Sequence, residues 1–299
     1  MNIEFTSLIK MMQAIPNEDA AIEYFKAIRW KHGEFCPHCG GDRLYHFEGG
    51  RKFKCAAPEC RMKFSLRFGT VFEASKIPLQ KWLYAIWIIT NHPKGIASTT
   101  LSTDIGVTQK TAWFMMHRLR HAARTQSFNR QLGGIVEADE SFFGGKEKNK
   151  HANKRGKDKK VVVFGMLERG GELRAHPVDS LKDVKSEIIA HVKPGAVLMT
   201  DEWTGYSRFN QRFWHASVNH SAGEYSANGY VHVNGMESAW ALIKRQIYGI
   251  HHWVSPKHLH RYISEATWRY NRRAVETGGR VVEMISRLDG RLTYKALIA

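Results

Sequence analysis

The sequence predicts a multidomain chain in which a small cysteine-rich module and a helical region precede an α/β domain. All four cysteines lie between Cys36 and Cys60, and apolar residues recur at helical spacing from about residue 78 to 125. After about Leu132, short apolar strands alternate with helices. We therefore expect five segments: helical 1–33, cysteine-rich 34–68, helical 78–128, α/β 132–278 and a C-terminal tail 279–299.

The charge balance favours a polyanionic partner. The chain has 45 Lys and Arg against 28 Asp and Glu, a net charge of +17. Such an excess favours nucleic acid, or less often an acidic membrane face; the alternative is a basic protein that is ribosome-associated or simply soluble. The sequence contains no run of about 18 apolar residues, so we expect no membrane span. The N-terminus lacks the features of a secretory signal. We therefore expect a cytoplasmic protein.

The cysteine spacing predicts a structural zinc site. Two residues lie inside the first cysteine pair, four inside the second and fifteen between them, and the pairs are Cys36 with Cys39 and Cys55 with Cys60. Two such thiolate pairs can hold one tetrahedral Zn²⁺, and four thiolates leave no open position for catalysis. A module this small needs a cross-link such as a bound metal ion, because it cannot bury a large hydrophobic core. The alternatives are free buried cysteines, or a site in which His38 or His46 replaces one cysteine.

The segment from Ile96 to about His121 has the pattern of a helix-turn-helix. Two helices are expected on either side of a turn that contains Gly106. Polar residues at the start of the second helix can face base edges or phosphates, and a basic residue further along can contact phosphates. The residues that we assign to DNA contact are Thr108, Gln109, Lys110 and Arg118. The alternative is a plain helical hairpin that packs on the α/β domain.

The α/β domain is expected to contain a strand over residues 133–145, a hairpin over 161–179, a helix near 182–191 and a strand over 196–200. Helices are expected over 234–248 and from Ser255 to about Arg272, where Pro256 suits a helix start. A lysine-rich run, 146–160, is expected to be a loop. This order of elements fits an RNase H-like layout.

Three acidic residues stand at rigid places in this domain. Asp139 ends the strand GGIVEAD, Asp201 follows the strand AVLMT, and Glu237 lies in the first turn of a helix. In-line cleavage of a phosphodiester is helped by two metal ions about 3.5–4 Å apart, and Mg²⁺ prefers carboxylate oxygens. The three carboxylates therefore predict a site for Mg²⁺ or Mn²⁺.

Each carboxylate also has a purely structural interpretation. The two aspartates can be solvated residues at strand ends, and Asn234 followed by Glu237 resembles a capping box. Two neighbours extend the catalytic hypothesis. Glu137 faces the same side of its strand as Asp139 and could be an additional carboxylate. Lys244 lies about two helical turns after Glu237, where it could touch a DNA phosphate.

The combined motifs resemble bacterial insertion-sequence transposases with an N-terminal zinc ribbon and a DDE catalytic domain. The resemblance runs from about residue 16 to 275 and includes the segments VEADESFFGG, MTDEWTGY and HVNGMESAWALIKRQIYG. It implies an RNase H-like fold, dependence on Mg²⁺, recognition of terminal inverted repeats in double-stranded DNA, and strand transfer into target DNA.

The resemblance carries over to particular residues. It matches Asp139 and Asp201 to the two catalytic aspartates, Glu237 to the glutamate and Lys244 to the basic residue that follows it. Asn234 matches an asparagine that takes the third metal position in some relatives, so the third position is open between Asn234 and Glu237. Because transposition joins two DNA ends, we expect a homo-oligomer, a dimer or larger, that is associated with the nucleoid.

Two other functions compete with an active transposase. An RNase H-like nuclease, such as a junction resolvase, would not need a separate helix-turn-helix to bind terminal repeats. A domesticated transposase that regulates by binding DNA would have no physical need for all three carboxylates. Dependence of activity on Mg²⁺ separates these classes, because DNA binding by a regulator should survive chelation.

Overall fold

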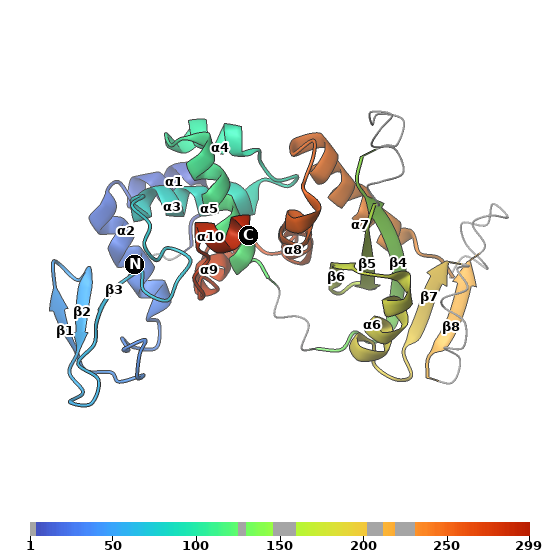
Figure 1. Cartoon of the computed structure of the whole chain (residues 1–299), viewed down its shortest axis with the longest axis horizontal. Coiled ribbons are helices and arrows are strands. Elements are labelled where there is room, and N and C mark those ends of the chain that lie inside the picture. Colours follow the sequence, from blue (N-terminus) through green and yellow to red (C-terminus); the bar gives the residue numbers. More distant parts are fainter. Residues whose placement is uncertain (1–3, 125–129, 146–159, 202–211, 219–230) are drawn as a thin grey trace. The chain divides into compact units, whose positions relative to one another are not determined.

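The computed structural model describes residues 4–124, 130–145, 160–201, 212–218 and 231–299 (Figure 1). The chain divides into two compact units, Met1–Ala123 with Ala274–Ala299, and Arg124–Arg273. The expected C-terminal tail, 279–299, is therefore part of the N-terminal unit, and the α/β unit ends before the predicted boundary at 278. Most of the lysine-rich run, 146–159, lies outside the described residues.

The N-terminal unit combines helices with a small three-stranded antiparallel sheet of order β1-β2-β3. Helix α9 packs against both α2 and α3, which is why the last part of the chain belongs to this unit. Its elements are α1 (Leu8–Ala14), α2 (Glu18–Arg29), β1 (Leu44–Phe47), β2 (Lys52–Cys55), β3 (Lys63–Ser65), α3 (Leu79–Asn91), α4 (Ser98–Ile105), α5 (Gln109–Ala122), α9 (Thr277–Ser286) and α10 (Tyr294–Ile298).

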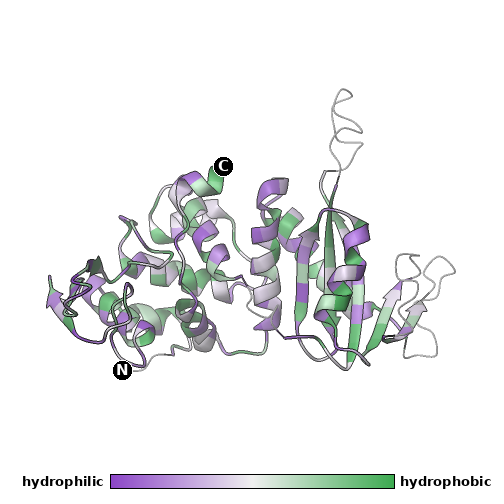
Figure 2. Cartoon of the chain, turned by 60° about the horizontal axis from the view of Figure 1, so that its bottom comes forward, coloured by the Kyte–Doolittle hydropathy of each residue, from purple (hydrophilic) through white to green (hydrophobic). Residues whose placement is uncertain are grey.

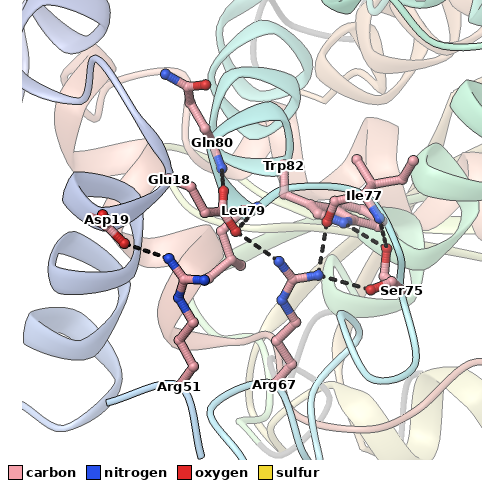
Figure 3. A network of polar contacts seen from close by, with 9 residues as sticks. All are labelled: Glu18, Asp19, Arg51, Arg67, Ser75, Ile77, Leu79, Gln80 and Trp82. Atoms are coloured by element: carbon pink, nitrogen blue, oxygen red, sulfur yellow. Dashed lines mark hydrogen bonds and ion pairs between the residues drawn. The ribbon is translucent and has the colours of Figure 1, made fainter. Parts of the chain in front are cut away.

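A carboxylate of α2 holds the beginning of α3 (Figure 3). Helix α3 follows Pro78, which supplies no side-chain cap. Glu18 supplies it instead, because its two oxygens accept from the backbone N–H groups of Leu79 at 2.9 Å and Gln80 at 3.0 Å. Arg67 donates to the same carboxylate at 2.9 Å. One side chain thus satisfies two orphan N–H groups of α3 and is itself paired with a cation.

Helices α4 and α5 are joined by a short turn at Gly106, which adopts the left-handed conformation with φ +61°. Thr108 caps α5 by accepting from Thr111 N at 3.2 Å. The predicted DNA-contact residues Thr108, Gln109 and Lys110 are exposed. The Gln109 side chain donates to Ser98 Oγ at 2.8 Å.

The expectation that Arg118 contacts phosphate is wrong. Its side chain is only 5% exposed and donates to the carbonyl of Val71 at 2.8 Å. Its guanidinium also lies 4.5 Å from the centre of the Phe114 ring. Burial lowers the pKa of Arg118. The residue therefore helps to hold α5 in its unit and cannot reach a ligand on the surface.

The second unit contains a five-stranded sheet of order β6-β5-β4-β7-β8. β4 pairs antiparallel with β5, and β5 with β6, whereas β4, β7 and β8 run parallel. The strands are β4 (Ile135–Phe143), β5 (Val161–Glu168), β6 (Leu173–Val178), β7 (Val197–Asp201) and β8 (Trp214–Val218), and the helices are α6 (Val184–His191), which follows a 3₁₀ turn at Leu181–Asp183, α7 (Asn234–Lys244) and α8 (Pro256–Asn271).

The two faces of this sheet carry separate hydrophobic clusters. Val136 and Ala138 of β4 pack with α6, whereas Phe143 of the same strand packs with α7 and α8. Because side chains alternate along a strand, Glu137 and Asp139 face α7 and α8. Figure 2 shows hydrophobic and hydrophilic residues mixed along the strands of the sheet.

The predicted secondary structure differs from the observed one at two places that matter for the site. The strand expected over residues 133–145 is β4, Ile135–Phe143, so Asp139 lies inside this strand and not at its end. The helix expected over 234–248 is α-helical only to Lys244 and continues as a π-helix, Arg245–Ile250. Within the part of the chain that the structure describes, no helix combines the length and hydropathy needed to cross a membrane.

We expect Glu18→Ala to destabilise the N-terminal unit by roughly 1–3 kcal/mol, because it removes two acceptors from α3 and leaves Arg67 without its carboxylate partner. Asp19→Ala is the matched control. This substitution breaks the ion pair between Asp19 and Arg51, in which the Asp19 side chain is 81% exposed. Such exposed pairs contribute about 0–1 kcal/mol to stability. Urea unfolding of both variants measures the difference, and equal losses would contradict the capping role of Glu18.

Candidate active site and metal centre

The four cysteines converge on one point in the N-terminal unit. Their sulfur atoms all lie within 4.8 Å of one another, with Cys36 Sγ 3.8 Å from Cys60 Sγ and Cys39 Sγ 3.5 Å from Cys55 Sγ. Zn–S bonds of about 2.3 Å in a tetrahedron require sulfur atoms about 3.8 Å apart. Four residues separate Cys55 from Cys60 in the sequence, against two between Cys36 and Cys39, and this difference does not prevent a tetrahedral arrangement of the four sulfur atoms.

The local backbone explains how the first cysteine pair is presented. Cys36 and Gly40 close a tight turn, in which Gly40 N donates to the Cys36 carbonyl at 2.8 Å and Gly40 has φ +79°. Neither histidine that could replace a cysteine does so. His38 lies 4.5 Å from the Phe68 ring, and His46 Nε2 lies 2.8 Å from a carboxylate oxygen of Glu34.

Asp139 and Asp201 lie side by side on neighbouring parallel strands. The pairing of β4 with β7 ends at Glu137 opposite Met199, and Asp139 and Asp201 each come two residues later. The charge of Asp201 contributes to the raised pKa of Asp139, so the two carboxylates lie close together. Both strands show their odd-numbered residues here to the face covered by α7. The parallel pairing thus brings together two carboxylates that are far apart in the sequence.

The environment of Asp139 shifts its titration strongly. Burial, followed by the negative charges of Asp201 and Glu140, raises the pKa of Asp139 from 3.8 to about 7. Two hydrogen bonds oppose this shift. Oδ1 accepts from Glu140 N at 2.8 Å and Oδ2 accepts from Trp240 Nε1 at 2.9 Å. A cation placed between the two aspartates would relieve their repulsion.

Trp240 reaches Asp139 because β5 has no side chain beneath it. Gly165 pairs with Asp139 across β4 and β5. A Cβ atom at Gly165 would lie 2.7 Å from Trp240 Cζ2 and 2.5 Å from Met236 Cε, so only glycine lets α7 approach the sheet this closely. No local sequence pattern indicates that Trp240 donates a hydrogen bond to Asp139, so this contact could not be predicted from the sequence.

The start of α7 differs from the expected capping box. Val233 occupies the N-cap position without a side-chain cap, and Asn234 is the first residue of the helix. The cap comes from β4, because Glu137 Oε2 accepts from Met236 N at 2.9 Å. Asn234 and Glu237 are both exposed, and Asn234 does not occupy the N-cap position that a capping box requires.

Glu237 belongs to the helix that covers the two aspartates. Met236 N meets Glu137 and Trp240 meets Asp139, so α7 advances four residues while β4 advances two. These steps correspond to about 6 Å of helix and about 6.6 Å of strand, which means that α7 and β4 run in step. Glu237 lies between these two anchor points along the helix.

The three carboxylates are not gathered as closely as the cysteines. Among the described residues, the cysteine set is the one group of three or more His, Cys, Asp or Glu whose ligand atoms all lie within 4.8 Å. Carboxylates that flank two ions about 3.5–4 Å apart can be spaced more widely than this. Lys244 ends α7 and is exposed. Seven residues of continuous helix put it on nearly the same face as Glu237.

Comparison with known proteins agrees with the division of the chain. Residues 16–63 match the model of a transposase zinc-ribbon domain, and residues 131–271 match that of an ISXO2-like transposase domain. The chain is also similar to a protein described as an uncharacterized protein in transposable element ISH50, from Halobacterium salinarum. The two are 28% identical over 268 residues, which cover 83% of this chain and 86% of the relative.

We expect one Zn²⁺ per chain, and its removal by a chelator should unfold the ribbon, because binding and folding of such a site are coupled. Zinc content and amide exchange at residues 44–65 measure this. The strands of the second unit are the internal control, since their exchange should not change. Full protection of residues 44–65 in zinc-free protein would contradict a stapling role.

We expect Asp139→Asn to stabilise the metal-free protein at pH 8 but not near pH 4. The pKa of Asp139 in the folded state, about 7, lies above its ordinary value of 3.8. Between these values the folded state keeps a proton that the unfolded state has lost, so the wild type loses stability as pH rises through this window. Urea unfolding without added Mg²⁺ or Mn²⁺, with zinc retained, at both pH values provides the measurement. A wild-type-to-variant difference that is independent of pH would contradict the shifted pKa.

Proposed function

Since this chain belongs to the insertion-sequence transposases with an N-terminal zinc ribbon, we propose that it cuts and rejoins DNA through divalent metal ions. The proposed ligands are Asp139, Asp201 and Glu237. The proposed substrates are the terminal inverted repeats of a mobile element and a target DNA. The observation that carries this proposal is the pair of aspartates held side by side beneath α7.

The residues present suit a hard divalent cation. Asp139 and Asp201 offer only oxygen, which Mg²⁺ and Mn²⁺ prefer. Burial, followed by the negative charges of Asp201 and Glu140, raises the pKa of Asp139 to about 7. Each oxygen of Asp139 accepts one hydrogen bond and keeps a further lone pair. Bound Mg²⁺ would supply Lewis acidity for the attacking and leaving oxygens of an in-line displacement.

The protein's own contribution is to hold the carboxylates rigidly and to bind the DNA backbone. Asp139 is fixed by the Trp240 indole and by its own strand. Glu237 and Lys244 present a carboxylate and an ammonium group from one exposed helix face. Lys244 would contact the phosphate next to the scissile bond, where a point charge suits phosphate binding. Proton loss from Asp139 would accompany metal binding below about pH 7.

The topology of the second unit supports an RNase H-like catalytic domain. Its strands follow one another as an antiparallel three-stranded meander, a helix and two further strands parallel to the first. This arrangement puts the first and fourth strands of the domain, β4 and β7, next to each other. One carboxylate from each of these central strands, with a third from a covering helix, is a compact way to mount two metal ions.

We propose that the N-terminal unit recognises the element's ends. The start of α5 presents three exposed polar residues, Thr108, Gln109 and Lys110, as the first residues of a recognition helix do. The net charge of +17 would strengthen binding to phosphates. Because joining requires two ends together, the active form would be a dimer or larger.

We expect Asp201→Asn to lower Mg²⁺-dependent cleavage of a DNA with the element's own ends by at least 1000-fold, with end binding within a few fold of wild type. Glu237→Gln should behave in the same way, because it removes one charge from the site. Asn234→Ala should cut at nearly the wild-type rate. If Asn234→Ala abolished cleavage while Glu237→Gln remained active, the third metal ligand would be Asn234 and not Glu237.

The same assay separates the competing functions. A chain that cuts any branched or flanking DNA but never joins an end would be a nuclease. Specific end binding that survives chelation, without cleavage by the wild type at any Mg²⁺ concentration, would identify a regulator and contradict the proposed function.

A further inference from the structure

Glu137 is the most buried carboxylate near the candidate active site. Its side chain is 1% exposed, two residues before Asp139 on the same face of β4. One oxygen accepts from Met236 N at 2.9 Å, and the other accepts from Arg169 Nε at 2.6 Å. A buried carboxylate is strongly destabilising unless it is paired and hydrogen-bonded. Here both oxygens are engaged within the protein.

Arg169 connects this carboxylate to β7 and to the segment that enters α7, and its backbone also bonds to β4. Its backbone N–H donates to the carbonyl of Ile135 on β4 at 2.9 Å. Its Nη2 donates to the carbonyl of His232 at 2.8 Å and lies 2.9 Å from His232 Nδ1. The same nitrogen lies 3.0 Å from Met199 Sδ on β7. One guanidinium therefore joins β4, β7 and the segment that enters α7.

Gly235 gives independent support for a close fit at this point. A Cβ atom there would lie 2.8 Å from Glu137 Oε2 and 2.9 Å from Leu167 Cδ2. Real Cβ contacts are essentially never this short, so any other residue at this position would push α7 away from β4. Glycine is otherwise unfavourable inside a helix, and its presence here is explained by the approach of Glu137.

We propose that Glu137 and Arg169 form a positioning pair that sets the first turn of α7 over Asp139 and Asp201, and that Glu137 is not a metal ligand. The inference rests on the proposed function, because the residues positioned are Asn234 and Glu237. Both oxygens of Glu137 face protein donors, one on each side. Its negative charge also suits the positive end of the α7 dipole.

The pair matters because catalytic carboxylates must be held within about 0.5 Å of their productive geometry. Glu237 follows Met236 directly, so a loss of the bond to Met236 N displaces Glu237 with it. The Trp240 contact to Asp139 would remain as a single anchor at the next turn of the helix. With one anchor in place of two, α7 could pivot on the sheet.

A double-mutant cycle tests the pair. Glu137→Gln and Arg169→Met should each slow Mg²⁺-dependent cleavage at least tenfold, with end binding within twofold of wild type. In Glu137→Gln, the single amide oxygen cannot accept from both Arg169 Nε and Met236 N. In the Glu137→Gln and Arg169→Met double variant, that oxygen is free to accept from Met236 N and no buried charge is unpaired, so the double variant should be no slower than the worse single variant. If Glu137→Gln abolished cleavage while Arg169→Met cut DNA at the wild-type rate, Glu137 would be a metal ligand and the proposal would be overturned. The proposal would also be overturned if the fold-loss of cleavage rate in the double variant equalled the product of the two single fold-losses.

Two further measurements keep the test decisive if a charge variant folds poorly or the wild type does not cut DNA. Gly235→Ala changes no charge and should also slow cleavage at least tenfold. In all variants, amide exchange of residues 234–240 should rise, and this readout does not depend on activity. Glu168→Gln is the matched control, since it breaks an ion pair with Arg130 at the end of β5 and should leave both exchange in α7 and the cleavage rate of folded protein unchanged.

Wild type that shows no cleavage would refute the proposed function alone, because exchange in α7 would still report the anchoring. Unchanged exchange of residues 234–240 in Glu137→Gln and Gly235→Ala would refute the positioning pair, whatever the wild type does to DNA.

Discussion

The hydrogen bond between the Glu137 carboxylate and the backbone of Met236 is the contact on which the geometry of the second unit's site depends. It joins the central strand of the sheet to the helix that covers it. With the Trp240 bond to Asp139, it makes strand and helix advance together. Along α7, Glu237 lies between these two contacts.

The N-terminal unit uses the same physical solution at α3. Neither α3 nor α7 begins with a residue that caps its own helix, since Pro78 and Val233 stand at the two N-cap positions. Each helix receives a carboxylate from a distant element, Glu18 in one case and Glu137 in the other. Both carboxylates are paired with an arginine. An uncapped helix start is thereby turned into a tertiary contact that fixes where the helix lies.

Sequence patterns predicted those features that depend on neighbouring residues. The cysteine spacing anticipated the observed cluster, and strand alternation placed Asp139 and Glu137 on one face. The misassigned residues depend on distant contacts. Asn234 looked like a helix cap because the pattern cannot show that β4 supplies one. Arg118 looked like a surface residue because the carbonyl of Val71 that holds it lies 47 residues away. The roles of Trp240 and Arg169 likewise became visible only through tertiary structure.

The central claim is that Asp139, Asp201 and α7 form one divalent-metal site, and the most direct test is a crystal structure of the chain with Mn²⁺, using anomalous scattering to locate the ion. The account predicts Mn²⁺ bound between Asp139 and Asp201, at about 2.0–2.3 Å from an oxygen of each, with Glu237 nearby and Glu137 still bound to Arg169. Mn²⁺ absent from this position, or bound by Glu137 in place of its arginine, would contradict the account.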